Sequence, residues 1–362
     1  MVDTLLVVSG KIPPDIHEQV KTGKRPRPDY LALASSLQAD ILDYSEILSM
    51  GNLSTRIIRF LGGINAAMAW ECFRRRGRYS LIFTDGEQVG IPFAVFLKFL
   101  DSGKRNVRHA MIVHILSVRN KMLFFDLLKI ESAIDRFFVY ATYQQNFIIN
   151  RWKVPREKVA WIPFQADGQF FHPLDKADQE KSNNRQMICS AGLEFRDYPT
   201  LLSAVDGLDV DVVLAAASPW SKRSDTTQNR DIPKNVTVQR FSLFDMRELY
   251  DRASFVVVPL YPVFFQAGVT TIMEAMAMGK AVIVTRTPGQ TDYVQDGISG
   301  IYVPPGDIPA IRDAILRLLA NPAEAARLGQ NARDIFKKEY DLDCYVDKIN
   351  QVISGLLEEA KL

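Results

Sequence analysis

The sequence predicts an α/β protein made of two doubly wound domains, each a parallel sheet covered by helices. The chain has 362 residues, which is enough to bury two hydrophobic cores. Short apolar, β-branched runs alternate with amphipathic stretches of roughly 10 to 20 residues, the pattern of repeated strand–helix units. Apolar residues make up 47% and charged residues 24% of the chain, which excludes a disordered, collagen-like or coiled-coil protein.

The first half of the chain contains apolar runs that predict one parallel sheet. The predicted strands are Leu5–Val8, Ile41–Asp43, Leu81–Thr84, Ala110–His114, Phe137–Tyr140 and Val159–Ile162. Hydrophobic periodicity then stops, and polar residues accumulate between Pro163 and Arg185. We therefore predict a first domain over residues 1–165 and a linker over residues 166–185.

The second half repeats this pattern and predicts a second sheet. Its predicted strands are Met187–Ala191, Val210–Ala215, Val236–Gln239, Phe255–Val258, Ala281–Val284 and Ile301–Val303. Stretches rich in Ala, Leu, Glu and Arg predict final helices over Ile308–Ala320, Pro322–Lys337 and Asp341–Leu362. We predict a second domain over residues 186–340, with the last helix, residues 341–362, packing back on the first. Such sheets bind ligands at the carboxyl ends of their strands, so we expect the site between the domains.

Charge is distributed unevenly between the two halves. Residues 1–165 carry 23 Lys and Arg against 15 Asp and Glu, whereas the remainder carries 21 against 27, so the whole chain is +2. Basic clusters at residues 21–27, 74–78 and 104–108 form either a face for an anionic partner or three separate solvated loops. We expect no nucleic-acid partner, because aromatic residues do not alternate with these clusters as stacking platforms would.

The sequence also bears on membrane association. No uncharged apolar stretch reaches the roughly 18 to 20 residues of a membrane span, and the first residues lack the basic region of a signal peptide. We expect a cytoplasmic protein, and a further hypothesis is peripheral contact of the basic first domain with an anionic membrane at its inner face. The stretch Val118–Lys129 mixes bulky apolar and basic residues, so it predicts either a helix at a membrane surface or one packed on the sheet.

The most informative stretch for chemistry runs from Val256 to Lys280. It predicts a buried strand, a loop carrying Gly268 and a helix that begins near Val269 and Thr270. The amides at the start of a helix favour phosphate oxygens, so residues 267–270 form a candidate phosphate site. Glu274 lies one turn further on, where its carboxylate could accept both hydroxyls of a ribose; the alternative is a solvent-exposed helix residue.

This stretch resembles the retaining GT-B glycosyltransferases of the large sucrose-synthase and mannosyltransferase-like family, of group 1 type. The likeness is dense in the second half and thin in the first. It is also carried by Gly192, Ile162-Pro163 with Asp167, Phe171-His172-Pro173, Ala281–Thr285, Gly289–Gly300 and Val303–Asp307. The resemblance implies transfer of a hexose from a nucleotide-diphosphate sugar, UDP- or GDP-linked, to a hydroxyl of a glycan, lipid or small molecule. It further implies retention of anomeric configuration and no metal or other cofactor.

The resemblance implies roles for two residues on either side of the glycine loop. In the family, two glutamates with seven residues between them bracket the donor. The second matches Glu274, which would hold the ribose, and the first position is occupied by Gln266. A glutamine can hydrogen-bond a sugar hydroxyl, but it offers no negative charge to a cationic transition state.

The family neutralises the diphosphate with an arginine and a lysine that follow the first strand of the second domain. Here Gly192 follows that strand, and Leu193 occupies the usual arginine position. We therefore expect Arg196 to supply the positive charge that neutralises the diphosphate, and Lys222 or Arg223 to supply a second one.

Candidate residues of the first domain follow predicted strands. His114 ends a strand where the family places a histidine that faces the donor sugar. Gly10 lies in the loop after the first strand and would let the backbone approach the donor. Asp15 and His17 in the same loop, and Asp85 after the third strand, are the candidate acceptor-side residues.

Glu87 follows Asp85 closely and forms a further acceptor-side pair with it; the alternative is that both acids are only solvated.

Two other interpretations stay open. One is an inverting GT-B glycosyltransferase, in which His17 acts as the general base. The other is a catalytically silent binding subunit, which is suggested by Gln266 and Leu193 at two positions where the family has charged residues.

Overall fold

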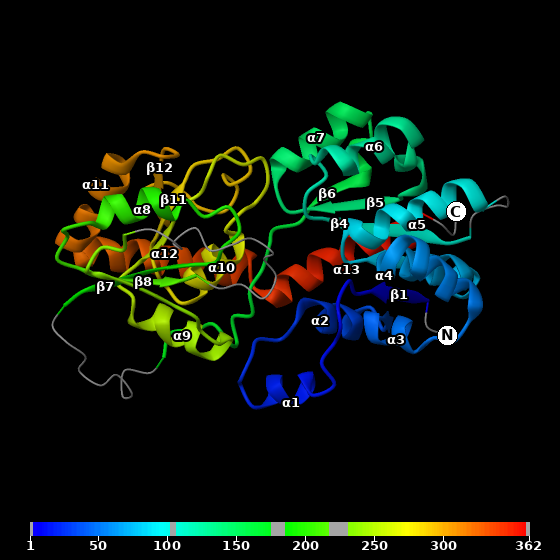
Figure 1. The fold of residues 1–362 in the computed structure, drawn as a ribbon, viewed down its shortest axis with the longest axis horizontal. Coiled ribbons are helices and arrows are strands. Elements are labelled where there is room, and N and C mark those ends of the chain that lie inside the picture. Colours follow the sequence, from blue (N-terminus) through cyan, green and yellow to red (C-terminus); the bar gives the residue numbers. More distant parts are fainter. Residues whose placement is uncertain (1–2, 102–105, 175–184, 217–230, 360–362) are drawn as a thin grey trace. The chain divides into compact units, whose positions relative to one another are not determined.

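The computed structural model describes residues 3–101, 106–174, 185–216 and 231–359 (Figure 1). They divide into two compact units. The first consists of Met1–Glu18, Pro28–Ile162 and Tyr345–Leu362, and the second of Gln19–Arg27 and Pro163–Cys344. Within the described ranges, no helix is long and apolar enough to cross a bilayer.

The first unit is built on a parallel six-stranded sheet in the order β2-β1-β3-β4-β5-β6. Its strands are β1 (Thr4–Val7), β2 (Asp40–Leu42), β3 (Leu81–Thr84), β4 (Arg108–Val113), β5 (Arg136–Val139) and β6 (Val159–Trp161). The strand order reverses between β1 and β3, and in such sheets the loops at the reversal form the ligand crevice. The loops that follow β1 and β3 carry Gly10 and Asp85.

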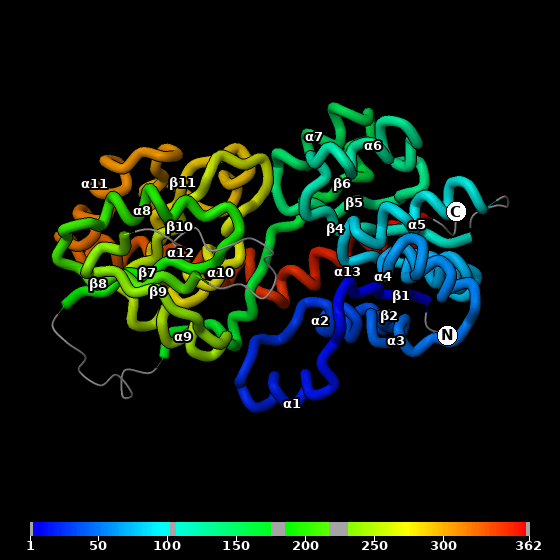
Figure 2. Tube along the Cα trace, in the orientation of Figure 1, coloured from blue at the N-terminus to red at the C-terminus, as the bar shows by residue number. Residues whose placement is uncertain are grey.

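Helices cover this sheet. They are α2 (Asp29–Ser36), α3 (Tyr44–Ser49), α4 (Leu53–Arg75), α5 (Glu87–Leu100), α6 (Arg119–Leu128) and α7 (Thr142–Trp152). The short helix α1 (Ile16–Lys21) begins in the first unit and ends in the second. The C-terminal helix α13 (Leu342–Glu358), red in Figure 2, joins the first unit from Tyr345 onward, and the hydroxyls of Tyr140 and Tyr345 lie 3.0 Å apart. Strands β1 and β3 are buried at every position, as expected of a parallel sheet that is covered on both faces.

The second unit has its own parallel six-stranded sheet, in the order β12-β11-β10-β7-β8-β9. Its strands are β7 (Met187–Ala191), β8 (Asp211–Ala215), β9 (Val236–Gln239), β10 (Val256–Val258), β11 (Val282–Thr285) and β12 (Gly300–Val303). Its helices are α8 (Tyr198–Val205), α9 (Leu243–Arg252), α10 (Val269–Ala277), α11 (Ile308–Ala320) and α12 (Pro322–Glu339). The order reverses between β7 and β10, so the loop of Gly192 and the loop of Gly268 leave the sheet side by side.

The predicted fold class is confirmed. Each strand predicted from the sequence is present, and its observed ends lie within two residues of the predicted ones. The three final helices are also present, at Ile308–Ala320, Pro322–Glu339 and Leu342–Glu358. Burial of β-branched residues on both faces of each sheet is the physical reason why the apolar runs were reliable signals.

Candidate functional site

Two glycine loops of the second unit meet at one arginine. Gly192 has a φ of +90° and Gly268 a φ of +80°, a backbone region that disfavours other residues. A Cβ added at Gly192 would lie 2.7 Å from Arg196 Nη2, and one added at Gly268 would lie 3.3 Å from Arg196 Nη1. The guanidinium therefore occupies the space that side chains at these two positions would need.

Arg196 is buried, with 3% of its surface exposed. Its Nε donates to the Ala191 carbonyl oxygen at 2.7 Å, Nη1 to the Glu194 carbonyl oxygen at 2.9 Å, and Nη2 to Thr271 Oγ1 at 3.0 Å. Burial lowers the pKa of Arg196. All three acceptors are neutral oxygens, so these hydrogen bonds position the guanidinium without neutralising its charge.

Helix α10 begins directly beside this cation. Gly268 is its N-cap residue, Val269 is buried, and Thr270 is exposed. The positive end of the helix dipole thus adds to the positive charge of Arg196. The two features together favour an anion at the start of α10.

Glu274 follows one turn later on α10 and is half-buried. Its Oε2 accepts a hydrogen bond from the hydroxyl of Tyr250, on α9, at 2.8 Å. Burial raises the pKa of Glu274 to about 7, although the Tyr250 hydrogen bond and the charge of Arg196 act in the opposite direction. The alternative of a solvent-exposed glutamate is wrong, because the side chain is half-buried and its carboxyl accepts the hydrogen bond from Tyr250.

Gln266 lies in the loop before α10 and is 7% exposed. A second glutamine, Gln290, supports the same loop: its Nε2 donates to the Ala267 carbonyl oxygen at 2.8 Å. The backbone amide of Gly289 also donates to the Val263 carbonyl oxygen at 3.3 Å. A Cβ at Gly289 would come within 2.2 Å of the Phe265 nitrogen, so only glycine allows this close approach of the two loops.

Lys222 and Arg223, the predicted second cations, lie outside the described residues.

In the first unit, the loops after β1 and β3 are joined through Asp85. Its carboxylate accepts from the Ser9 backbone amide at 2.8 Å and from the Ser9 hydroxyl. Burial raises the pKa of Asp85, whereas the bonds from Ser9 and the charge of His114 lower it. Gly10 follows Ser9, and a Cβ added there would meet open space. The structure therefore brings Asp85 and Gly10 together.

His114 lies beside this pair at the end of β4. Its Nε2 is 3.0 Å from the Asp85 carbonyl oxygen, and its ring centroid is 5.6 Å from that of Tyr140. The side chain is half-buried. The structure thus groups His114 with Asp85 and Gly10, at the strand ends where the sequence predicted them.

The prediction of Glu87 as an acceptor-side residue is wrong. Glu87 is 1% exposed and accepts from the backbone amides of His114 at 3.0 Å and Ile115 at 3.1 Å, and from Lys121 Nζ at 2.5 Å. Its carboxylate holds the loop between β4 and α6 and is enclosed by it. The other acceptor-side candidates, Asp15 and His17, are exposed, the first just before α1 and the second on it.

The family profile described as "Glycosyl transferases group 1" matches residues 175–335. The chain is also 31% identical over 235 residues to an uncharacterized glycosyltransferase of Methanocaldococcus jannaschii, which is 63% of this chain and 64% of that one. The matched stretch and this relative support a group 1 glycosyltransferase.

A further relative is also a glycosyltransferase. It is 27% identical over 214 residues to an alpha-D-kanosaminyltransferase of Streptomyces kanamyceticus, which is 54% of each chain. It thus spans about half the length of that relative.

Among solved structures, sucrose-phosphate synthase of Thermosynechococcus elongatus superposes with a TM-score of 0.71 at 18% identity over 99% of this chain and all of that one. Anabaena HepE in complex with UDP and glucose gives 0.72 at 14% identity, over 98% and 100%. These likenesses identify the fold as GT-B.

The stretch that matches the group 1 family contains the predicted site residues of the second unit but not those of the first. The predicted donor-side residues, Gly192, Arg196, Gln266, Gly268 and Glu274, lie inside the matched stretch. The residues of the first unit lie outside it.

Sequence reasoning missed Tyr250, Thr271 and Gln290. Two of these residues could have been found from the sequence. Thr271 lies in the first turn of the predicted helix, and Gln290 lies in the stretch Gly289–Gly300, which resembles the family. Among the described residues, no group of three or more His, Cys, Asp or Glu is arranged to hold a metal ion.

A pair of glycine substitutions tests the packing at the loop. Gly268 and Gly279 both have positive φ, +80° and +69°, but a Cβ at Gly268 would lie 2.8 Å from Val258 Cγ1, whereas at Gly279 its nearest neighbour would be at 3.6 Å. We expect Gly279→Ala to cost about 1 kcal/mol of backbone strain, and Gly268→Ala to cost about 1 to 3 kcal/mol more. Urea unfolding measures both. Equal losses would contradict the close packing of Gly268 against β10 and Arg196.

Proposed function

We propose that the chain transfers a hexose from a nucleotide-diphosphate sugar to a hydroxyl acceptor, with the second unit binding the donor and the first the acceptor. The observation that carries this proposal is the buried Arg196 guanidinium beside the N-terminus of α10, with the Glu274 carboxyl one turn further on. The match of residues 175–335 to the group 1 glycosyltransferases supports the reaction class. The HepE structure contains UDP and glucose, which supports a UDP-sugar as the first donor to test, beside GDP-sugars.

Arg196 and the first amides of α10 would bind the diphosphate. A guanidinium has five N–H groups, and the described hydrogen bonds involve Nε, Nη1 and Nη2 once each. Each Nη carries a second N–H, and these two would donate to phosphate oxygens. Lys222 or Arg223 would add the second positive charge.

Glu274 would bind the ribose. The Tyr250 hydroxyl holds Oε2, and Oε1 would accept the ribose hydroxyls. Gln266 would hydrogen-bond the sugar, and His114 would contact it from the first unit. Asp85, with Gly10 beside it, would face the acceptor.

The proposed reaction retains the anomeric configuration. The bond between the anomeric carbon and the β-phosphate oxygen breaks, and a bond to the acceptor oxygen forms on the same face of the sugar. The acceptor proton passes to the departing phosphate. Arg196 and the α10 amides would stabilise the charge that develops on this phosphate, so we propose that the reaction proceeds without a metal ion.

The reaction is tested by measuring nucleoside diphosphate release from UDP-, GDP-, ADP- and dTDP-sugars, with and without EDTA and with candidate acceptors. We expect turnover with one donor, insensitivity to EDTA, and a product of unchanged anomeric configuration by proton NMR. An inverted product would instead support the mechanism with His17 as the base. Binding of a nucleotide sugar without turnover against every acceptor would support a silent binding subunit, and no binding of any donor would overturn the proposed site.

The pKa of Glu274 predicts how nucleotide binding depends on pH. The carboxyl is protonated below about pH 7 and ionised above it, and only the carboxylate accepts from both ribose hydroxyls. Affinity for the nucleotide should therefore rise about tenfold between pH 6 and pH 8.

Two variants complete this pH test. Glu274→Gln should bind weakly at both pH values, because its side chain cannot ionise. Tyr250→Phe removes a bond that lowers the pKa of Glu274, so the rise in affinity should move to higher pH. Isothermal titration calorimetry measures each affinity, and a Glu274→Gln profile parallel to the wild-type profile would contradict the role of this carboxyl.

A further inference from the structure

Helix α4 is interrupted after its first turns. Gly63 has a φ of 78° and a ψ of −177°, which lies outside the helical region, so residues 53–62 form a separate helical segment. This segment carries an apolar stripe at positions i, i+4, i+7 and i+8, the spacing that places side chains on one face of a helix. We call it the α4 stripe, and its members and exposed fractions are Leu53 (71%), Ile57 (48%), Phe60 (88%) and Leu61 (76%).

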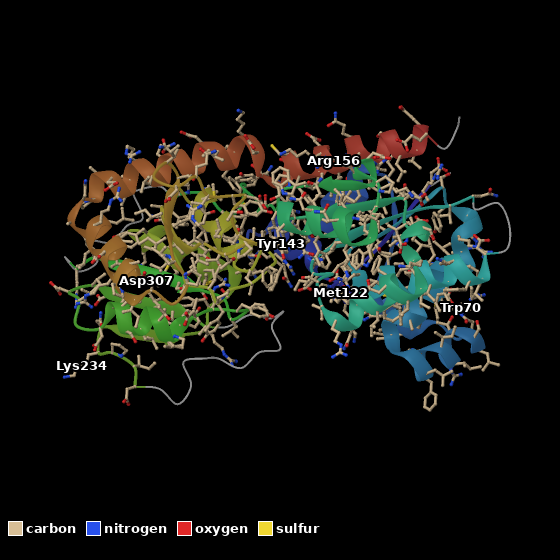
Figure 3. All side chains as sticks on the ribbon, turned by 90° about the horizontal axis from the view of Figure 1, so that it is seen from above. Trp70, Met122, Tyr143, Arg156, Lys234 and Asp307 are labelled. Carbon is tan, nitrogen blue, oxygen red and sulfur yellow. The ribbon has the colours of Figure 1, made fainter. Side chains whose placement is uncertain are left out.

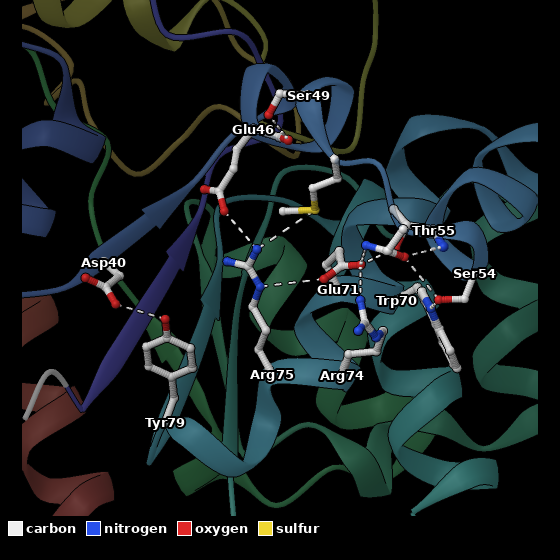
Figure 4. Close-up of polar contacts among 12 residues, drawn as sticks. Asp40, Glu46, Ser49, Ser54, Thr55, Trp70, Glu71, Arg74, Arg75 and Tyr79 are labelled. Carbon is white, nitrogen blue, oxygen red and sulfur yellow. Dashed lines mark hydrogen bonds and ion pairs between the residues drawn. The ribbon is translucent and has the colours of Figure 1, made fainter.

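The opposite face of the segment is tied to the rest of α4 by hydrogen bonds (Figure 4). The Thr55 hydroxyl donates to Glu71 Oε1, and Trp70 Nε1 donates to Ser54 Oγ at 3.1 Å. Asn52, the N-cap residue, donates to the same Glu71 oxygen at 2.9 Å. The polar face of the segment therefore turns inward, and the α4 stripe turns toward solvent.

Glu71 is a stable anchor for this arrangement. Only 3% of its side chain is exposed, and it pairs with Arg74 at 2.9 Å and Arg75 at 3.6 Å. Arg75 also pairs with Glu46 on α3, at 2.8 Å. A buried carboxylate with this many partners holds the two parts of α4 in a fixed orientation.

The charged residues on the segment that carries the α4 stripe have one sign. Residues 47–70 contain Arg56 and Arg59 and no Asp or Glu. Arg56 is exposed and Arg59 is half-buried, and both lie on the segment that carries the stripe. An exposed apolar face on a helical segment whose only charged residues are two arginines is complementary to a surface that is apolar inside and anionic outside.

Two other helices of the first unit also expose apolar side chains. Helix α5 packs against both α4 and α6, and exposes Phe99 (56%) near its end. Helix α6 buries Phe125 and exposes Leu127 (72%), so it is packed on the core and still presents apolar surface. Figure 3 shows side chains of α4 extending outward at this edge of the unit, beyond the labelled Trp70.

We propose that the α4 stripe inserts into the surface of an anionic lipid bilayer, with Arg56 and Arg59 at the level of the headgroups. The segment of residues 53–62 is about 15 Å long and ends at Gly63, so it is suited to lie in the interface and is too short to span it. The proposal goes beyond the proposed function and does not depend on it.

Sedimentation with lipid vesicles at about 0.15 M salt tests this proposal. We expect the wild-type protein to bind vesicles of phosphatidylcholine mixed with phosphatidylglycerol and not vesicles of phosphatidylcholine alone. A Phe60→Ser, Leu61→Ser variant should bind about tenfold more weakly or worse, and an Arg56→Gln, Arg59→Gln variant should lose the preference for anionic lipid. The matched control is Leu316→Ser on α11, where the leucine is 42% exposed, and its binding should equal that of the wild type.

A second measurement places the stripe in the lipid. Phe60→Trp should show a blue-shifted fluorescence difference spectrum with the mixed vesicles and none with phosphatidylcholine alone. Absence of wild-type binding, or equal binding by the Phe60→Ser, Leu61→Ser variant, would overturn the proposal. Concentration-dependent dimers that this variant abolishes, without vesicle binding, would also overturn it and would assign the stripe to a second copy of the chain.

Discussion

The proposed donor site depends on one interaction, the set of hydrogen bonds that the buried Arg196 guanidinium makes with the end of β7, the following loop and Thr271 of α10. These bonds join the end of β7 to the first turn of α10, which follows the neighbouring strand β10 and is distant in sequence. They also explain the two glycines, because a side chain at Gly192 or Gly268 would collide with the guanidinium or its surroundings. The cation is thus in place before any ligand binds, and the site is preorganised for an anion.

The sequence predicted the features that depend on local pattern. Apolar runs identified the strands, and the order of strand, glycine loop and helix identified Gly268 and Glu274. It could not predict the partner of Glu274, because Tyr250 lies on another helix and only the fold brings the two together. The prediction for Glu87 was wrong, because its carboxylate accepts hydrogen bonds from the backbone amides of His114 and Ile115. The sequence does not distinguish an acidic residue in this role from one that faces a ligand.

Helix α4 shows how polar contacts can reverse the usual orientation of an amphipathic helix. The spacing of Leu53, Ile57, Phe60 and Leu61 is the spacing of a buried face. The break at Gly63 and the bonds from Thr55 and Asn52 to Glu71 turn that face outward instead. The hydrophobic pattern alone does not predict which face of the segment is exposed. The orientation depends on the buried carboxylate of Glu71, more than a dozen residues further along the chain.

We propose that the buried Arg196 guanidinium provides much of the binding energy for a diphosphate. The most direct test is the difference in affinity between a nucleoside and its diphosphate, measured by calorimetry for the wild type and for a folded Arg196→Gln variant. The diphosphate should bind the wild type more tightly than the nucleoside does. In the variant this gain in affinity should be smaller by a factor of at least about ten, while the affinity for the nucleoside is unchanged. An equal gain in both proteins would contradict this role of Arg196.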